Sequence, residues 1–359
     1  MVREFFATDV GPSYPEWEKS GRPPREFWNA AGAVGILGIG VPEEYGGLPN
    51  SSFKHSAVVT EEAQRAGLVL GGVRVQTDIC MPYFLEYATA DQQARWLPDL
   101  ASGAAVSALA MTEPGAGSDV KAMGTRAVRD GDHYVLNGAK TFITNGLSAD
   151  LVIVAAKTDP AAGRQGISLL VVDADSSGFE RGRKLEKIGL RTQDLAELAF
   201  TDVIVPVNNL LGEEGRGFDY LTSNLAQERL SIALNSQAAA VAALAAAVAE
   251  VGQIGTVGQT VKFELASCRA DVEAGQALAD AALDRHVTGE LTPADAAIVK
   301  LFCTELQGRV TERCLRALGP AAYARTSVVG RAFADARVSR IYGGSSEIMK
   351  VITAKAMGL

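Results

Sequence analysis

Residues 107–119, SALAMTEPGAGSD, mark the point at which the pattern of the chain changes from helical to β. Ser107–Met111 reads as a short strand, and a loop rich in glycine and other small residues follows it. Small residues let a backbone approach a ligand closely, and consecutive N–H groups can form an anion-binding nest. Thr112 and Ser118 add hydroxyl donors to this loop. The alternative interpretation is an ordinary Gly/Pro loop whose aspartate, Asp119, acts as a cap.

The sequence before this point predicts helices, because apolar residues recur at helical spacing. The predicted segments are Arg25–Leu37, Ser56–Ala66 and Asp91–Leu100. After it, short alternating runs are separated by turn residues at roughly ten-residue spacing, which predicts a small β barrel or sandwich. The predicted strands are Thr125–Val128, Tyr134–Leu136, Lys140–Thr144, Leu151–Lys157, Ile167–Val172 and Glu197–Val205.

Strong helix formers return from about Glu213, and Tyr220–Glu250 contains neither Gly nor Pro. Further helices are predicted at Val261–Val287, Thr292–Leu318 and Ser346–Met357. The order predicts an α+β fold of three domains. They are an N-terminal helical domain (1–105), a central β domain (106–212) and a C-terminal helical bundle (213–359).

The composition excludes several classes of protein. The 359 residues are 47% apolar and 21% charged, which is typical of a globular chain, and the net charge of −8 argues against a nucleic-acid surface. Four cysteines and three histidines show no metal-ligand spacing, so no metal site and a reduced, cytoplasmic protein are expected. The most apolar run, Ala238–Ala249, is shorter than the roughly 20 residues of a membrane span.

Three further motifs are candidates for a site. In Lys140–Gly146, strand alternation puts Phe142 and Thr144 on one face, which suits a flat heteroaromatic ligand. A plain barrel strand is the alternative. In Gln227–Arg229, a carboxylate on a partly apolar helix face would have the raised pKa of a proton-abstracting base. A charged pair at the helix surface is the alternative there.

The last motif is Asp335–Arg337 followed by Ile341–Lys350, IYGGSSEIMK. A Gly-rich loop enters a helix, so free N–H groups lie at the helix start and can bind an anion. An ordinary helix cap, with Glu347 in the first turn, explains the same residues.

The four motifs, in this order and at these separations, resemble the acyl-CoA dehydrogenase family over almost the whole chain. The loop Leu37–Gly47 near the N-terminus adds to the resemblance. It implies a helical domain, a β domain and a four-helix bundle, with FAD held between domains and neighbouring subunits. The implied reaction is α,β-dehydrogenation of an acyl-CoA thioester. A carboxylate removes the α-proton, the β-hydrogen leaves as hydride to the flavin, and electrons pass to an electron-transferring flavoprotein.

The catalytic base separates branches of this family. Most members carry it as Glu in the loop before the last helix, where this chain has Gly343. The long-chain and isovaleryl branches carry it on the bundle helix immediately before an Arg, where this chain has Glu228 and Arg229. The resemblance therefore assigns Glu228 as the base and places the chain nearest the long-chain branch. The N–H of Gly343 would bind the thioester oxygen.

The remaining roles are carried over by motif. Arg229, Tyr342 and Gly344 would contact the substrate. The residues implied to contact FAD are Met111, Thr112, Gly117, Ser118, Phe142, Thr144, Gln259, Ser345 and Glu347.

The chain departs from the family in the FAD contacts that each subunit lends to its neighbour. No Arg-x-x-Phe-Gly motif follows the long helix, and Glu250–Gln259 keeps only Gln259 as a family contact. The usual Gln before a Gly-Gly-x-Gly loop is Arg316, and Pro320, which has no N–H, replaces a loop glycine. We therefore expect a hetero-oligomer, α2β2, with a paralogous subunit. A homotetramer with remodelled loops is the alternative.

Two other functions remain open at this stage. The chain could be a non-catalytic subunit that supports a partner's site, although such a subunit should keep the lent residues. An acyl-CoA oxidase or flavin monooxygenase on the same fold would differ in its use of oxygen. The acyl group, whether long, branched or a steroid side chain, cannot be read from these motifs.

Overall fold

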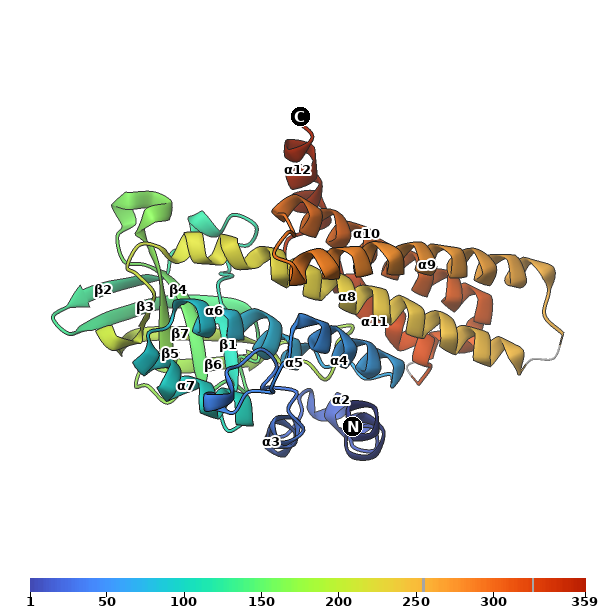
Figure 1. Ribbon diagram of the computed structural model, residues 1–359, viewed down its shortest axis with the longest axis horizontal. Helices are drawn as coiled ribbons and strands as arrows, with labels where there is room; N and C mark the ends of the chain where they lie inside the picture. The colour runs from blue at the N-terminus through green and yellow to red at the C-terminus, as the bar shows by residue number, and fades with distance from the viewer. Residues whose placement is uncertain (254–255, 325) are drawn as a thin grey trace.

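The computed structural model describes residues 1–253, 256–324 and 326–359. Ile254 and Gly255, within the segment where the lent FAD motif is altered, lie outside the described residues, as does Arg325. The molecule is elongated, with the β domain at one end and the helical bundle at the other (Figure 1). The N-terminal helices lie along one side, so the three segments meet near the middle.

The N-terminal domain is built from short helices around an aromatic core that includes Phe27 and Trp28. The helix predicted over 25–37 ends earlier, at Ala33, because Gly35 adopts a positive φ of 80°. The elements are α1 Val2–Phe5, η1 Phe6–Val10, α2 Tyr14–Ser20, α3 Arg25–Ala33, η2 Glu43–Tyr45, α4 Phe53–Arg65, α5 Gly71–Arg74, η3 Val75–Cys80, α6 Met81–Tyr87 and α7 Ala90–Ser102.

The central domain is an eight-stranded sheet with the order β6-β7-β3-β2-β4-β5-β8, and β1 pairs with β4 in parallel. Two of the predicted strands form one long strand, β3, which passes through Gly138 and pairs with β7 across two register shifts. The sequence did not predict β6, because this strand is mostly exposed and polar. The strands are β1 Ser107–Ala110, β2 Arg126–Asp130, β3 His133–Thr144, β4 Leu151–Lys157, β5 Ile167–Asp173, β6 Phe179–Lys184, β7 Leu195–Pro206 and β8 Leu210–Leu211, with short helices η4 Val120–Ala122, η5 Pro160–Gly166 and η6 Val207–Asn209.

The C-terminal domain packs long helices side by side (Figure 1). Alanines of the 238–249 run lie in its core against Leu306 and Val310, as close helix packing requires. The sequence did not predict α11, which precedes the glycine-rich loop. The helices are α8 Gly217–Gly252, α9 Gln259–Val287, α10 Pro293–Leu318, η7 Pro320–Tyr323, α11 Val328–Ser339 and α12 Ser346–Ala356.

One helix among the described residues, α8, is long and apolar enough to cross a membrane by length and composition. The alanine-rich run 238–249, taken in the sequence as too short to span a membrane, is thus part of a longer apolar helix. Its most apolar window has a mean hydropathy of 1.7, and 67% of that window is buried inside the fold. Core helices of folded bundles have the same property, so this feature alone is a weak indication of a membrane.

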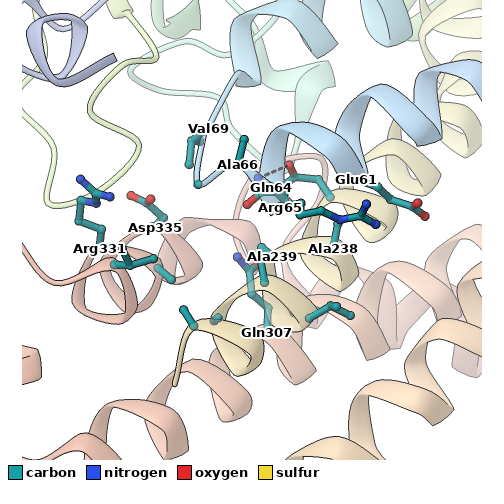
Figure 2. A pocket seen from close by; sticks show the side chains of 18 of the residues that line it. Glu61, Gln64, Arg65, Ala66, Val69, Ala238, Ala239, Gln307, Arg331 and Asp335 are labelled. Atoms are coloured by element: carbon teal, nitrogen blue, oxygen red, sulfur yellow. Dashed lines mark hydrogen bonds between the residues drawn. The ribbon is translucent and has the colours of Figure 1, made fainter. Parts of the chain in front are cut away.

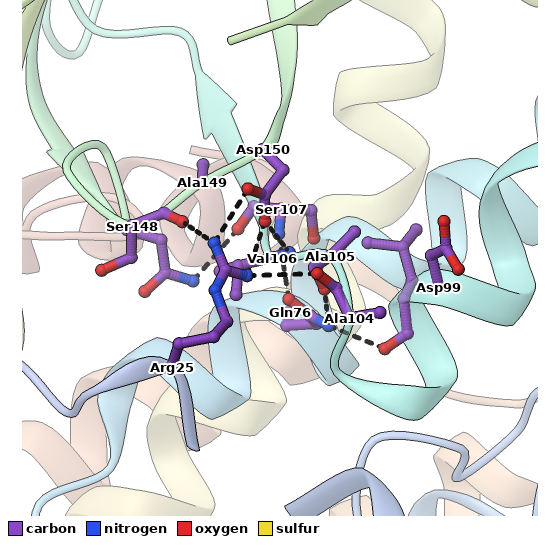
Figure 3. Close-up of polar contacts among 12 residues, drawn as sticks. Arg25, Gln76, Asp99, Ala104, Ala105, Val106, Ser107, Ser148, Ala149 and Asp150 are labelled. Carbon is purple, nitrogen blue, oxygen red and sulfur yellow. Dashed lines mark hydrogen bonds and ion pairs between the residues drawn. The ribbon is translucent and has the colours of Figure 1, made fainter. Parts of the chain in front are cut away.

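Polar contacts join the N-terminal and β domains where the chain changes pattern (Figure 3). The Arg25 guanidinium donates to both carboxylate oxygens of Asp150, at 2.7 and 2.8 Å. Asp150 also accepts the N–H of Val106 at 2.8 Å, and the Gln76 side-chain oxygen accepts the N–H of Ser107 at 2.9 Å. The start of β1 is thus fixed from both sides, and so is the origin of the loop that follows it.

Candidate active site

The loop after β1 is held by a buried ion pair. Lys140 Nζ on β3 lies 2.8 Å from Glu113 Oε1 and 3.0 Å from the carbonyl oxygen of Met111. The N–H groups of Gly124 and Thr125 also donate to the Glu113 carboxylate. Burial alone would raise the pKa of Glu113, but these donors outweigh it and lower that pKa to about 2. The loop is therefore a fixed platform.

The predicted aromatic and hydroxyl pair lies directly beside this platform. The N–H of Thr141 donates to the carbonyl of Thr112 at 2.9 Å, which joins the loop to β3. Phe142 is 63% exposed and has a φ of +56°, within an irregularity of the β3–β7 pairing. A left-handed backbone at a bulky residue costs roughly 1–3 kcal/mol and is concentrated at functional sites. The Thr144 hydroxyl accepts a hydrogen bond of 2.9 Å from Gln193.

These residues fit the flavin that the resemblance implies. The exposed ring of Phe142 offers an apolar face, and Thr144 offers a hydroxyl whose own proton points away from Gln193. Nothing lies within 4 Å of a Cβ built on Gly115 or Gly117, so their backbone is open to a ligand. The loop aspartate, Asp119, caps η4 by accepting the N–H of Lys121 at 3.3 Å, as the alternative of an ordinary capped loop predicted. The cap leaves the backbone of Gly115 and Gly117 open, so the loop can be both a cap and a ligand-binding segment.

Glu228 lies on α8 in the interior, 4% exposed. The alternative of a charged pair at the helix surface is wrong, because Arg229 is buried as well. Tyr83 of α6 donates its hydroxyl to Glu228 Oε1 at 3.1 Å. Burial raises the pKa of Glu228 to about 7, and the Tyr83 hydrogen bond and the charge of Arg229 only partly oppose this. A carboxyl with this pKa changes its protonation state near neutral pH.

The glycine-rich loop packs against the same face of α8. A Cβ built on Gly343 would lie 2.1 Å from Cδ1 of Ile232, one helical turn after Glu228. Gly343 and Gly344 have φ values of +63° and +98°, and their N–H groups donate to no backbone carbonyl within the described part of the chain. Arg229 Nε is buried without a hydrogen-bond partner among the same residues. A carboxylate and unsatisfied donors therefore meet at one place.

Other predicted contacts lie further away or serve as caps. Gln259 begins α9, beyond the far end of α8, and the 24 residues from Glu228 to Gly252 span about 36 Å of helix. Gln259 is therefore not brought to the other predicted flavin residues of its own chain. Ser345 caps α12 through the N–H of Ile348 at 3.4 Å, and Glu347 is exposed beside it.

Tyr342 lines a cavity of about 540 Å³ between α4, α8 and α11 (Figure 2). Its wall on α8 contains alanines of the 238–249 run, including Ala238, Ala239 and Ala242, so this run shapes a cavity as well as a helix contact. Gln64 of α4 donates to Asn235 at 3.0 Å along the same wall. Glu228 does not line this cavity.

Sequence reasoning missed two residues that contact the site, Tyr83 and Lys300. Tyr83 belongs to an apolar segment that carries no signal of its role. Lys300 is fully buried on α10, and its Nζ lies 2.7 Å from the carbonyl oxygen of Gly344. A lone lysine within the apolar stretch 296–303 was a readable sign of a special role.

A buried carboxyl, a glycine turn and an open loop beside an exposed aromatic ring, on a helical–β–helical fold, are consistent with a flavin-dependent enzyme. Comparison with known proteins agrees. The N-terminal, middle and C-terminal domain models of acyl-CoA dehydrogenase match residues 1–104, 108–203 and 215–358. The chain therefore belongs to the acyl-CoA dehydrogenase family and is a flavin-dependent oxidoreductase of fatty-acid metabolism.

Individual relatives match this chain over most of their own length. The long-chain specific acyl-CoA dehydrogenase of Sus scrofa mitochondria is 41% identical over 99% of this chain and 84% of the relative. An acyl-CoA dehydrogenase structure from Geobacillus kaustophilus is 43% identical, with a TM-score of 0.97 over 99% of this chain and 96% of that one. A chain from a structure described as the electron transferring flavoprotein of Acidaminococcus fermentans is 32% identical, with a TM-score of 0.94 over 99% and 96%.

Proposed function

We propose that this chain dehydrogenates an acyl-CoA thioester between its α- and β-carbons, with Glu228 as the base. The observation that carries the proposal is the buried carboxyl of Glu228, whose pKa is raised to about 7 beside Tyr83. A general base is most effective when its pKa lies near the working pH. The position that holds the base in most of the family is Gly343, which cannot accept a proton.

The proton step follows from the residues around Glu228. The ionised carboxylate takes the α-proton, and the electron pair of that C–H bond moves toward the thioester carbonyl. The N–H of Gly343 and the unpartnered Nε of Arg229 are donors for the negative charge that develops on the thioester oxygen. Because both donors are held in a largely buried site, water competes with them poorly.

The β-hydrogen must leave as a hydride. FAD, bound by the Met111–Ser118 loop, Phe142 and Thr144, would supply the hydride acceptor. An electron-transferring flavoprotein is the proposed next acceptor, since the family works with one in general. A cytoplasmic location is proposed from the four cysteines, all buried and unbridged.

We propose further that the active assembly is a hetero-oligomer. Pro320 opens η7, where a glycine N–H would otherwise be available to a neighbouring subunit's FAD, and proline has no such group. The loop after β1, which a backbone hydrogen bond joins to β3, would form this chain's own half of a flavin site together with Phe142 and Thr144. A paralogous chain would supply the missing half, giving one site for each unlike pair.

The test is purification of the chain alone and with each candidate paralog, followed by flavin absorbance near 450 nm against protein absorbance at 280 nm. We expect the lone chain to be colourless and the correct pair to hold about one FAD. Adding acyl-CoA without oxygen should then bleach the flavin of that pair. A lone chain that is yellow and active would overturn the hetero-oligomer, and a flavin-loaded pair that no acyl-CoA bleaches would overturn the reaction.

A further inference from the structure

Lys300 is a buried cation for which the proposed reaction gives no role. It lies on α10 with 0% exposure, and it forms no ion pair among the described residues. Its ammonium donates to the carbonyl oxygen of Gly344 at 2.7 Å. An uncompensated charge in the interior is costly, so a lysine at this position needs a reason other than packing.

The charges that face Lys300 come from three elements. Arg229 on α8 is a second cation, while Glu305 of α10 and Glu347 of α12 are the nearby carboxylates. Burial and, to a lesser extent, the charge of Arg229 lower the pKa of Lys300 to about 8, although Glu305 and Glu347 partly oppose this. Two cations therefore flank the loop that carries Gly343 and Gly344, where the proposed reaction builds negative charge.

Residues of α10 also hold the glycine-rich loop before α12 in place through hydrogen bonds. Glu305 accepts hydrogen bonds from Ser346 at 2.6 Å and from Arg340 at 3.2 Å, which closes the two ends of the loop. Lys300 holds its middle at the Gly344 carbonyl. The contact with Ile232 leaves Gly343 no space for a side chain, so the direction of its N–H depends on these clamps.

We propose that Lys300 is a positioning residue for the enolate: it fixes the Gly344 carbonyl, which keeps the Gly343 N–H directed at the thioester oxygen, and its charge adds to that of Arg229. This inference rests on the proposed function. Because Lys300 contacts the loop carbonyl, we expect its effect to fall on the enolate and far less on substrate binding.

Three variants separate the two parts of this role. Lys300→Met removes both the charge and the donor, Lys300→Gln keeps a donor to the Gly344 carbonyl without the charge, and Lys300→Arg keeps both. Thr311→Val is the matched control, because Thr311 is equally buried on α10 but eleven residues away, about 16 Å along the helix. If Lys300→Met fails to fold, Lys300→Gln carries the test.

The main measurement uses a β-ketoacyl-CoA bound to the flavin-loaded enzyme. Its α-carbon, between two carbonyls, ionises to an enolate that absorbs in the near ultraviolet, so the pH of half-ionisation reports the stabilisation of the enolate directly. We expect this midpoint to rise by about one pH unit, tenfold in the ionisation constant, in Lys300→Met, and by a smaller amount in Lys300→Gln, which loses the charge but keeps the donor. Lys300→Arg and Thr311→Val should stay at the wild-type value.

Turnover supplies the second reading. We expect kcat to fall about tenfold to a hundredfold in Lys300→Met, while KM for acyl-CoA changes less than threefold. An unchanged ionisation midpoint in Lys300→Met and Lys300→Gln would overturn the inference, as would a loss of activity only in proportion to lost flavin. If the wild-type enzyme itself neither binds nor oxidises acyl-CoA, the proposed function fails instead.

Discussion

Two buried carboxylates, Glu113 and Glu228, lie in the two halves of the site and behave in opposite ways. Glu113, in the loop after β1, has a pKa lowered to about 2, whereas that of Glu228, on α8, is raised to about 7. Both are removed from water, so burial acts on each in the same direction. The difference comes from their partners.

Glu113 accepts hydrogen bonds from Lys140 and from the N–H groups of Gly124 and Thr125. Glu228 accepts one from Tyr83, and the neighbouring guanidinium of Arg229 makes no hydrogen bond with it that relieves its burial. A fully satisfied carboxylate stays ionised and fixes structure, while a poorly satisfied one can exchange a proton. The loop half of the site is thus built for rigidity and the helix half for reactivity.

The largest effect should come from breaking the satisfied pair. Lys140→Met would leave the Glu113 carboxylate buried without its cation, at a cost of about 3–5 kcal/mol of unfolding free energy. Chemical denaturation measures this loss, and flavin binding should fall with it. Arg3→Ala, which breaks an exposed pair with Glu62, is the control and should cost no more than about 1 kcal/mol. Equal costs in the two variants would contradict the rigid role of Glu113.

The second prediction is a gain in unfolding free energy rather than a loss. The pKa of Glu228 is raised from 4.5 to about 7, so the folded protein binds more protons than the unfolded chain between these values, and stability falls as pH rises through them. Glu228→Gln removes this loss and keeps an acceptor for Tyr83. At pH 8 the variant should be more stable than the wild type by up to about 3 kcal/mol, with little difference at pH 4.5. The exposed Glu347→Gln is the control, and a pH-independent difference for Glu228→Gln would refute the assignment.

The third effect concerns the turn that faces Glu228. Gly343→Ala forces a Cβ into a left-handed backbone and against Ile232, so we expect a loss of about 1–3 kcal/mol and a marked fall in kcat. Ile232→Val removes the clashing Cδ1. In the double variant Gly343→Ala/Ile232→Val, part of the lost stability and part of the lost kcat should therefore be restored. Thermal unfolding and steady-state kinetics provide the two readings. Full activity in Gly343→Ala alone would show that the turn does not need a glycine.

The smallest effect should come from Tyr83→Phe. The Tyr83 hydroxyl lowers the pKa of Glu228, so its removal should raise that pKa further, by about one unit or about 1 kcal/mol. The rise of kcat/KM with pH should move to higher pH, and activity lost at pH 7 should return at pH 9. If the pH dependence of kcat/KM is unchanged, or moves to lower pH, Tyr83 does not lower the pKa of Glu228.

Local patterns made much of this molecule predictable. The long stretch without Gly or Pro predicted the helix α8. The glycine-rich loops at 111–119 and 341–347 indicated the two halves of the candidate site. The contact of Tyr83 with Glu228 joins residues 145 positions apart, and no local pattern encodes it. The polar edge strand β6 was missed because it lacks the burial that produces alternation. The sequence pattern could not distinguish whether the Glu228–Arg229 pair is exposed or buried, because its burial depends on how the three domains pack together.

Reduction of the flavin by acyl-CoA in a single turnover tests the role of Glu228 most directly. Wild type, Glu228→Gln and Glu347→Gln would each be loaded with FAD, together with the partner subunit if one is needed, and mixed with acyl-CoA in the absence of oxygen. We predict that Glu228→Gln binds acyl-CoA but bleaches at least about a thousandfold more slowly than wild type, while Glu347→Gln bleaches within tenfold of it. Bleaching of Glu228→Gln at the wild-type rate would show that another group removes the α-proton.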